Sequence, residues 1–204
     1  MEIIHVKKEK KGKYLIGLEN GITLPLYQKD CPHIKFEEGA DMDESTYRHL
    51  ILEVLRIRIQ KRTLYLLEKM DRTQAQLQEK LRQNHYPEML IEHAIQYAMS
   101  FHYIDDERYI QTYIRQHKEA KSKQRMRYDL LQKGCDRQLV DTVFEQIEDW
   151  EEEKQIFRLL KKRKYNPENS DEASKRKTYQ YLLRRGYKNE DVLRVMKNMS
   201  DESD

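Results

Sequence analysis

Cysteine is almost absent from this chain, and no stretch of it is apolar for long. Among 204 residues there are two cysteines, Cys31 and Cys135, which excludes a disulfide scaffold and a four-cysteine zinc site. No run of about 18 apolar residues is present, so no transmembrane helix is expected. The first residues lack the apolar segment of a secretory signal peptide. We therefore expect a cytoplasmic protein that makes no membrane contact.

Glycine and proline are also scarce, and they are unevenly distributed. The chain has six glycines and four prolines, and most of the glycines lie before residue 40. The later residues are rich in strong helix formers such as Leu, Gln, Glu, Lys and Arg. The body of the chain is therefore predicted to be almost wholly helical, and the first 39 residues to be different.

The first 39 residues carry the pattern of a β-hairpin. Two apolar runs flank Asn20-Gly21, a pair that strongly favours a tight turn between antiparallel strands. Residues 3–6 are apolar enough to form a third strand, and a ribbon this short needs a helix to pack against. That helix is predicted within 40–62, beginning at a cap near Asp43.

The helical body repeats itself about every 50 residues. The segments 81–86, 130–135 and 182–187 align without gaps, and each has apolar-periodic segments before and after it. Gly134 and Gly186 share one repeat position, which is the end of a helix, where a left-handed residue is needed. His85 holds that position in the first repeat. These patterns predict a mainly α fold, an elongated tandem array of three three-helix repeats preceded by a small N-terminal β-hairpin and a helix.

Six segments follow from these patterns, and Gly134 and Gly186 are the predicted structural turns. Each boundary lies where composition or periodicity changes. The predicted segments are an N-terminal β-hairpin extension (1–39), a connecting helix (40–62), helical repeat 1 (63–104), helical repeat 2 (105–150), helical repeat 3 (151–200) and an acidic tail (201–204).

Charge is strongly segregated although the formal net charge is only +3. Basic residues cluster in 54–62, 115–127, 158–164 and 175–188, and acidic residues cluster in 145–153. Such blocks suit a polyanion or a charged protein partner, whereas the alternative is that they are merely solvated helix faces. We expect the charged ends of the arginines that flank the repeated turn to face solvent. These are Arg125, Arg127, Arg184 and Arg185. The candidate contact residues are Arg115, Lys118, Lys121, Lys123, Arg125, Arg127, Lys161, Lys162, Arg184 and Arg185.

No catalytic, cofactor-binding or metal-binding constellation is predicted, so the chain is not expected to be an enzyme. The seven histidines show no His-Glu-x-x-His spacing, and neither a phosphate-binding glycine loop nor a nucleophile elbow occurs. Asp105-Asp106-Glu107 could be read as the metal-binding acidic cluster of a nuclease. Consecutive residues point to different sides of a helix, so we favour a role at a helix start. Cys135 is interpreted as a packing residue.

The order and spacing of the motifs resemble the RecX family over roughly residues 60–198. The resemblance rests on the three helical triplets and on the segments 103–109, 125–134 and 181–187. It implies a cytoplasmic bacterial protein that binds RecA filaments on single-stranded DNA and usually lowers their ATPase and strand-exchange activity. This would place it in DNA repair by homologous recombination and in the SOS response. The family is not known as one of enzymes, and the N-terminal hairpin lies outside its core.

We therefore predict a non-enzymatic regulator, usually an inhibitor, of RecA. Its partners would be the RecA nucleoprotein filament and single-stranded DNA, the latter bound weakly or through RecA, and a monomer is expected. The alternative is a stand-alone, non-specific DNA-binding protein built from helical repeats. A metal-dependent nuclease is a third and weaker alternative.

Overall fold

The computed structural model describes residues 1–147 and 150–199, and it divides the chain into two compact units, 1–106 and 107–204. The predicted acidic tail, 201–204, lies outside the described residues, as do residues 148–149 of the acidic block. No helix in the described part of the chain is long and apolar enough to cross a membrane.

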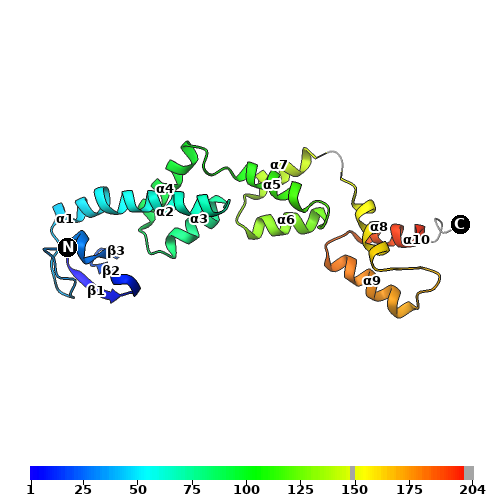
Figure 1. The fold of residues 1–204 in the computed structure, drawn as a ribbon, viewed down its shortest axis with the longest axis horizontal. Coiled ribbons are helices and arrows are strands. Elements are labelled where there is room, and N and C mark those ends of the chain that lie inside the picture. Colours follow the sequence, from blue (N-terminus) through cyan, green and yellow to red (C-terminus); the bar gives the residue numbers. More distant parts are fainter. Residues whose placement is uncertain (148–149, 200–204) are drawn as a thin grey trace. The chain divides into compact units, whose positions relative to one another are not determined.

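The first unit begins with a three-stranded antiparallel sheet (Figure 1). Its strands, in spatial order, are β1 (Ile3–Lys8), β2 (Lys13–Leu18) and β3 (Thr23–Tyr27). Between β2 and β3, Gly21 has a φ of +80°, and Asn20 Oδ1 accepts a hydrogen bond from the Ile22 amide at 3.1 Å. The predicted hairpin and its turn are confirmed, and β1 is the third strand.

A long helical run follows the sheet. Asp43 caps it, because its carboxylate accepts a hydrogen bond from the Thr46 amide at 2.9 Å and so satisfies a free donor of the first turn. The run contains α1 (Glu44–His49), a π-helical stretch (Leu50–Leu55) and α2 (Arg56–Lys69), and α3 (Gln74–Arg82) and α4 (Glu88–Ser100) complete the unit.

One hydrophobic core joins the sheet to these helices. Ile16 and Leu24 from the sheet and Leu55 from the helical run are fully buried in it. Figure 1 shows the sheet lying along one side of α1 and the start of α2. Burial of such a side chain contributes about 1.5–3 kcal/mol, which a small sheet cannot obtain alone. The expectation that the ribbon packs on a helix is confirmed.

The second unit consists of two three-helix groups, each with its own core. Phe144 and Leu130 are fully buried in the first core, and Leu182 and Val192 in the second. The helices are α5 (Asp106–His117), α6 (Lys123–Gln132) and α7 (Arg137–Glu145), then α8 (Glu152–Lys162), α9 (Glu172–Arg184) and α10 (Asn189–Asn198). A mainly helical chain with repeated three-helix groups and a small N-terminal sheet is confirmed, whereas the finer segment boundaries stay a prediction.

The same left-handed turn ends α3, α6 and α9. His85, Gly134 and Gly186 have φ values of 65°, 81° and 85° at the predicted repeat position. The next residue then donates a backbone hydrogen bond back to the last helical turn, which is the Schellman pattern. The donor amides are Tyr86, Cys135 and Tyr187, and the acceptor carbonyls are Leu81, Leu130 and Leu182, at 3.4, 3.1 and 3.3 Å. Cys135 is buried, with 4% of its surface exposed, as its interpretation as a packing residue requires.

Replacement of Gly134 tests this turn. A Cβ in the left-handed region costs about 1–2 kcal/mol, and β-branching adds to the strain. We expect Gly134→Val to lower the free energy of unfolding by about 1–3 kcal/mol, and Gly134→Asn to have a smaller effect because asparagine tolerates this region better. Thermal unfolding followed by circular dichroism measures both variants. An unchanged melting temperature for the valine variant would refute the turn.

Candidate functional site

The two three-helix groups of the second unit meet where α6 begins and α9 ends. Ser122 is the N-cap of α6, and its hydroxyl accepts a hydrogen bond from the Arg125 amide at 3.1 Å. The same hydroxyl donates to the backbone carbonyl of Arg185 at 2.8 Å. Ser122 is fully buried, so both bonds lie away from water. This contact is termed the inter-repeat junction below.

Gly186 fits the inter-repeat junction for two reasons. Its φ of +85° lies in the left-handed region, and the chain of the other helical group passes very close to it. A Cβ placed on Gly186 would lie 2.7 Å from Ser122 Oγ and 3.2 Å from the Arg125 amide nitrogen. The predicted structural turn is therefore also a site of close contact between two helical groups, which the sequence did not indicate.

A second line of hydrogen bonds supports the inter-repeat junction. The buried Gln155 on α8 donates from its side-chain amide to the Lys118 carbonyl at 2.5 Å and accepts from the Tyr187 hydroxyl at 3.2 Å. Burial, with the nearby Glu152 carboxylate adding to it, raises the pKa of Tyr187 to about 12, so this hydroxyl keeps its proton. The Glu152 carboxylate accepts a hydrogen bond from the Lys123 amide at 2.6 Å, which satisfies a free donor at the start of α6.

The inter-repeat junction brings together basic residues from two of the predicted clusters. Arg125 and Arg185 belong to sequence segments about 60 residues apart, yet both take part in the Ser122 contact. Both side chains are exposed, as is that of Arg184. Each guanidinium at the contact lies over an aromatic ring: Arg125 is 5.3 Å from the centre of Tyr128, and Arg185 is 4.7 Å from the centre of Tyr181. Such stacking holds an arginine in place. The Arg125 guanidinium also forms an ion pair with the Asp129 carboxylate, with Nε 3.1 Å from Oδ1, so its charge is partly offset.

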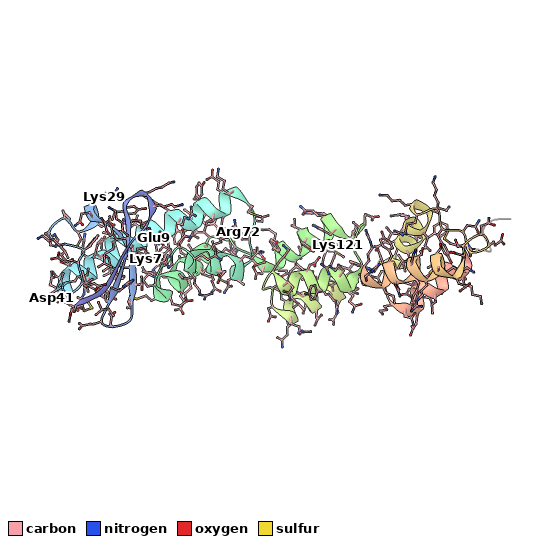
Figure 2. The ribbon with its side chains drawn as sticks, turned by 90° about the horizontal axis from the view of Figure 1, so that it is seen from below. Lys7, Glu9, Lys29, Asp41, Arg72 and Lys121 are labelled. Carbon is pink, nitrogen blue, oxygen red and sulfur yellow. The ribbon has the colours of Figure 1, made fainter. Side chains whose placement is uncertain are left out.

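Lys121, labelled in Figure 2, pairs with the same carboxylate as Arg125. Its ammonium donates to the Asp129 carboxylate at 2.8 Å and to the Tyr113 hydroxyl at 2.7 Å. Burial opposes the charge of Lys121, but these hydrogen bonds outweigh it and raise its pKa above the usual value. Burial likewise opposes ionisation of Asp129, yet the bonds from Lys121 and Tyr113 hold its pKa below the usual range. Lys121 therefore holds α5 and α6 together.

Arg127 is half-buried, so its charged end faces solvent only in part. It forms an ion pair with Asp141 at 3.0 Å, and its guanidinium lies 5.0 Å from the centre of the Phe144 ring. Its Nε is buried and has no hydrogen-bond partner among the described residues. The spacing of residues in α6 turns Arg127 toward α7, whereas it turns Arg125 toward the inter-repeat junction.

The remaining predicted contacts are dispersed over the second unit. Arg115 and Lys118 are exposed near the C-terminal end of α5, and Lys161 and Lys162 are exposed in the last turn of α8. Lys161 also lines a groove of about 590 Å³ between α8 and α10. Lys123 is half-buried, with its ammonium 5.7 Å from the centre of the Trp150 ring. The inter-repeat junction thus gathers Arg125, Arg184 and Arg185 and leaves the other candidates around it.

The acidic cluster at 105–107 has a structural role in the first unit. Asp106 Oδ1 accepts a hydrogen bond from the Gln74 amide at 2.8 Å, at the start of α3. Burial raises the pKa of Asp106, although the hydrogen bond from the Gln74 amide opposes this shift. Within residues 1–147 and 150–199, no group of three or more His, Cys, Asp or Glu side chains is placed to hold a metal ion.

One set of basic residues escaped the sequence prediction. The lysines at the end of β1 and the start of β2 lie around the same cavity as Arg58, Lys61 and Arg62 of α2. The signal was present, because five of the residues 7–13 are lysine. Only the fold shows that this run faces the basic segment 54–62.

Comparison with known proteins identifies the repeats. Residues 105–143 match the model of the RecX second three-helix domain, and residues 151–196 match that of the RecX third three-helix domain. The resemblance of this chain to the RecX family is confirmed by these matches. Proteins similar to it include the regulatory protein RecX of Clostridium beijerinckii, which is 27% identical over 98% of this chain and 95% of that protein. That of Caldanaerobacter subterraneus subsp. tengcongensis is 22% identical over 94% of this chain and 95% of that protein.

Solved RecX structures have the same fold. A crystal structure of regulatory protein RecX superposes with a TM-score of 0.64 at 22% identity, and covers 98% of this chain and 99% of that one. The crystal structure of RecX from Lactobacillus salivarius gives a TM-score of 0.62 at 20% identity, and covers 71% of this chain and 96% of that one. The first of these alignments includes the N-terminal sheet, so the sheet is part of a fold that a RecX protein shares.

Comparison of two alanine variants tests the inter-repeat junction. Gly39→Ala and Gly186→Ala each place a Cβ in the left-handed region at about 1–2 kcal/mol, and nothing lies within 4 Å of the Cβ position at Gly39. Gly186→Ala also pushes Ser122 out of its two hydrogen bonds, so we expect it to cost about 1–3 kcal/mol more than Gly39→Ala. Urea denaturation gives both free energies. Equal destabilisation by the two variants would show that the close approach at Gly186 is absent in solution.

Proposed function

We propose that this protein is a non-enzymatic regulator of RecA that binds the RecA filament on single-stranded DNA and lowers its ATPase and strand-exchange activity. Similarity to the RecX family supports a regulatory role. The observation that carries the proposal is the inter-repeat junction, beside which the exposed Arg125, Arg184 and Arg185 come from two helical groups. Exposed arginines of this kind complement an acidic protein surface or a phosphate backbone.

Inhibition by this route needs no chemistry from the chain. A protein that contacts neighbouring RecA protomers would hinder the movements that accompany ATP hydrolysis, or block the path of a second DNA. A chain with several linked helical groups would touch more than one protomer, so one molecule would restrain several sites. The proposal places the protein in the cytoplasm, as a monomer, in homologous recombination, DNA repair and the SOS response.

Titration of the DNA-dependent ATPase of RecA from the same organism tests this function. We expect suppression at less than one molecule per RecA protomer. Combined replacement of Arg125, Arg184 and Arg185 by alanine should raise the concentration for half-suppression at least about tenfold, because each exposed arginine contributes about 0.5–1 kcal/mol. Arg127 is left intact because its replacement would disturb the packing of α6 on α7.

A matched variant controls for the removal of charge. Arg48, Arg56 and Arg137 are exposed and lie outside the inter-repeat junction, so their combined replacement by alanine should leave suppression unchanged. Circular dichroism of both variants checks folding. Absence of any effect of the intact protein on RecA, in large excess and at low salt, would refute the function. Tight binding to bare duplex DNA would instead favour the stand-alone DNA-binding alternative.

A further inference from the structure

A basic cleft of about 840 Å³ lies in the first unit, between the β1–β2 hairpin and α2. Lys7 and Glu9, labelled in Figure 2, both line it. Its volume falls within the range of about 300–1,000 Å³ that is typical of ligand sites. The lining contains eight basic side chains and one acidic side chain: Lys7, Lys8, Lys10, Lys11, Lys13, Arg58, Lys61 and Arg62, with Glu9.

The one acidic residue of the lining does not neutralise this charge. Glu9 is already paired with Lys13 at 2.9 Å and lies 3.8 Å from His85. The hydrogen bond from Lys13 holds the pKa of Glu9 below its usual value, so the Glu9 carboxylate is charged near neutral pH. Within residues 1–147 and 150–199, Lys7, Lys10 and Lys61 make no ion pair. Several positive charges therefore face one concave space without a counter-charge from the chain.

The α2 side of the cleft is held rigidly. The Arg58 guanidinium donates to the Asp30 carboxylate at 2.7 Å and to the Pro25 carbonyl at 3.1 Å, which ties α2 to the edge of β3. Arg62 Nε is buried and has no hydrogen-bond partner among the described residues. A buried donor of this kind costs free energy unless a ligand or water satisfies it. The α2 wall of the cleft is fixed in place at Arg58.

The hairpin side is shaped by an unusual turn. Lys11 and Gly12 both have left-handed backbone conformations, with φ values of 61° and 73°. Both residues lie in the loop between β1 and β2, where the Glu9 amide donates a hydrogen bond to the Lys13 carbonyl at 2.7 Å. Lysine in the left-handed region costs about 1–2 kcal/mol relative to glycine. Lys10 and Lys11 both line the cleft, and such local strain tends to occur at functional sites.

The apolar part of the lining consists of Pro25 and two tyrosines, Tyr27 and Tyr86. Tyr27 has the Arg58 guanidinium 5.1 Å from its ring centre, and burial raises the pKa of Tyr86, so the Tyr86 phenol stays neutral. Cationic side chains around aromatic faces are the combination that holds single-stranded polynucleotides, by phosphate contacts and base stacking. A duplex keeps its bases stacked inside and would meet the cleft with phosphates only.

We propose that this cleft binds a short stretch of single-stranded polynucleotide through its phosphates, independently of RecA. The site is separate from the inter-repeat junction and lies in the first unit. It extends the proposed function without resting on it, because its test contains no RecA. The lysines supply the counter-charge to the backbone, and the fixed Arg58 and Arg62 wall sets where the strand lies.

Fluorescence anisotropy of a labelled oligothymidylate, titrated with the full chain over a range of salt concentrations, tests the cleft. Combined replacement of Lys7, Lys10 and Lys61 by glutamine removes charge from both walls. We expect the affinity to fall at least about tenfold. The slope of log K against log salt should shrink by about two, at roughly 0.7 for each phosphate that the variant no longer neutralises. These three side chains are exposed, so the variant should keep the wild-type circular dichroism.

The matched control replaces Lys35, Lys69 and Lys80 by glutamine, because these lysines are exposed, belong to the same unit and do not line the cleft. We expect this variant to bind as the wild type does. Equal weakening by both variants, or none by the cleft variant, would overturn the proposal. Competition gives a further test. The proposal would also be overturned if duplex DNA or inorganic polyphosphate displaced the labelled strand at a lower phosphate concentration than unlabelled oligothymidylate does.

Protection of lysines from acetylation gives a second readout that needs no substitution. With oligothymidylate bound, Lys7, Lys10, Lys11 and Lys61 should react more slowly, whereas Lys35 and Lys80 should react as before. Uniform protection across the chain, or protection confined to the second unit, would contradict the cleft as the binding site.

Discussion

The left-handed residue at the end of the second helix of each repeat is the constraint on which the rest of the structure depends. It turns the chain so that the third helix can pack back on the first two, and its following residue closes the helix with a backbone hydrogen bond. At Gly186 the turn has a second role. Because glycine has no Cβ, Ser122 of the neighbouring helical group can approach it closely. The inter-repeat junction and its exposed arginines follow from that close approach.

Much of this architecture could be predicted from local sequence. The turn at Asn20-Gly21, the cap at Asp43 and the repeated left-handed position each depend on a residue type whose conformational preference is strong. Burial of Cys135 followed from alignment with Tyr86 and Tyr187, because a repeat position keeps its packing role. These features are local in sequence, so pattern alone determines them.

The roles of individual charges could not be predicted in the same way. Lys121, Arg125 and Arg127 lie within seven residues of one another, yet the first two pair with Asp129, whereas the third pairs with Asp141 and packs on Phe144. The difference comes from which tertiary neighbour each helix face meets. The basic cleft was missed for the same reason, because residues 7–13 and Arg58 become neighbours only through the packing of the sheet on α2.

Electron cryomicroscopy of the protein bound to a RecA–DNA filament tests the central claim most directly. Arg125, Arg184 and Arg185 are exposed beside the inter-repeat junction, so we expect this face of the second unit to lie against RecA or the DNA backbone. The N-terminal sheet can then be located independently in the same map. A bound protein whose inter-repeat junction faces solvent, with contact made elsewhere on the second unit, would contradict the claim.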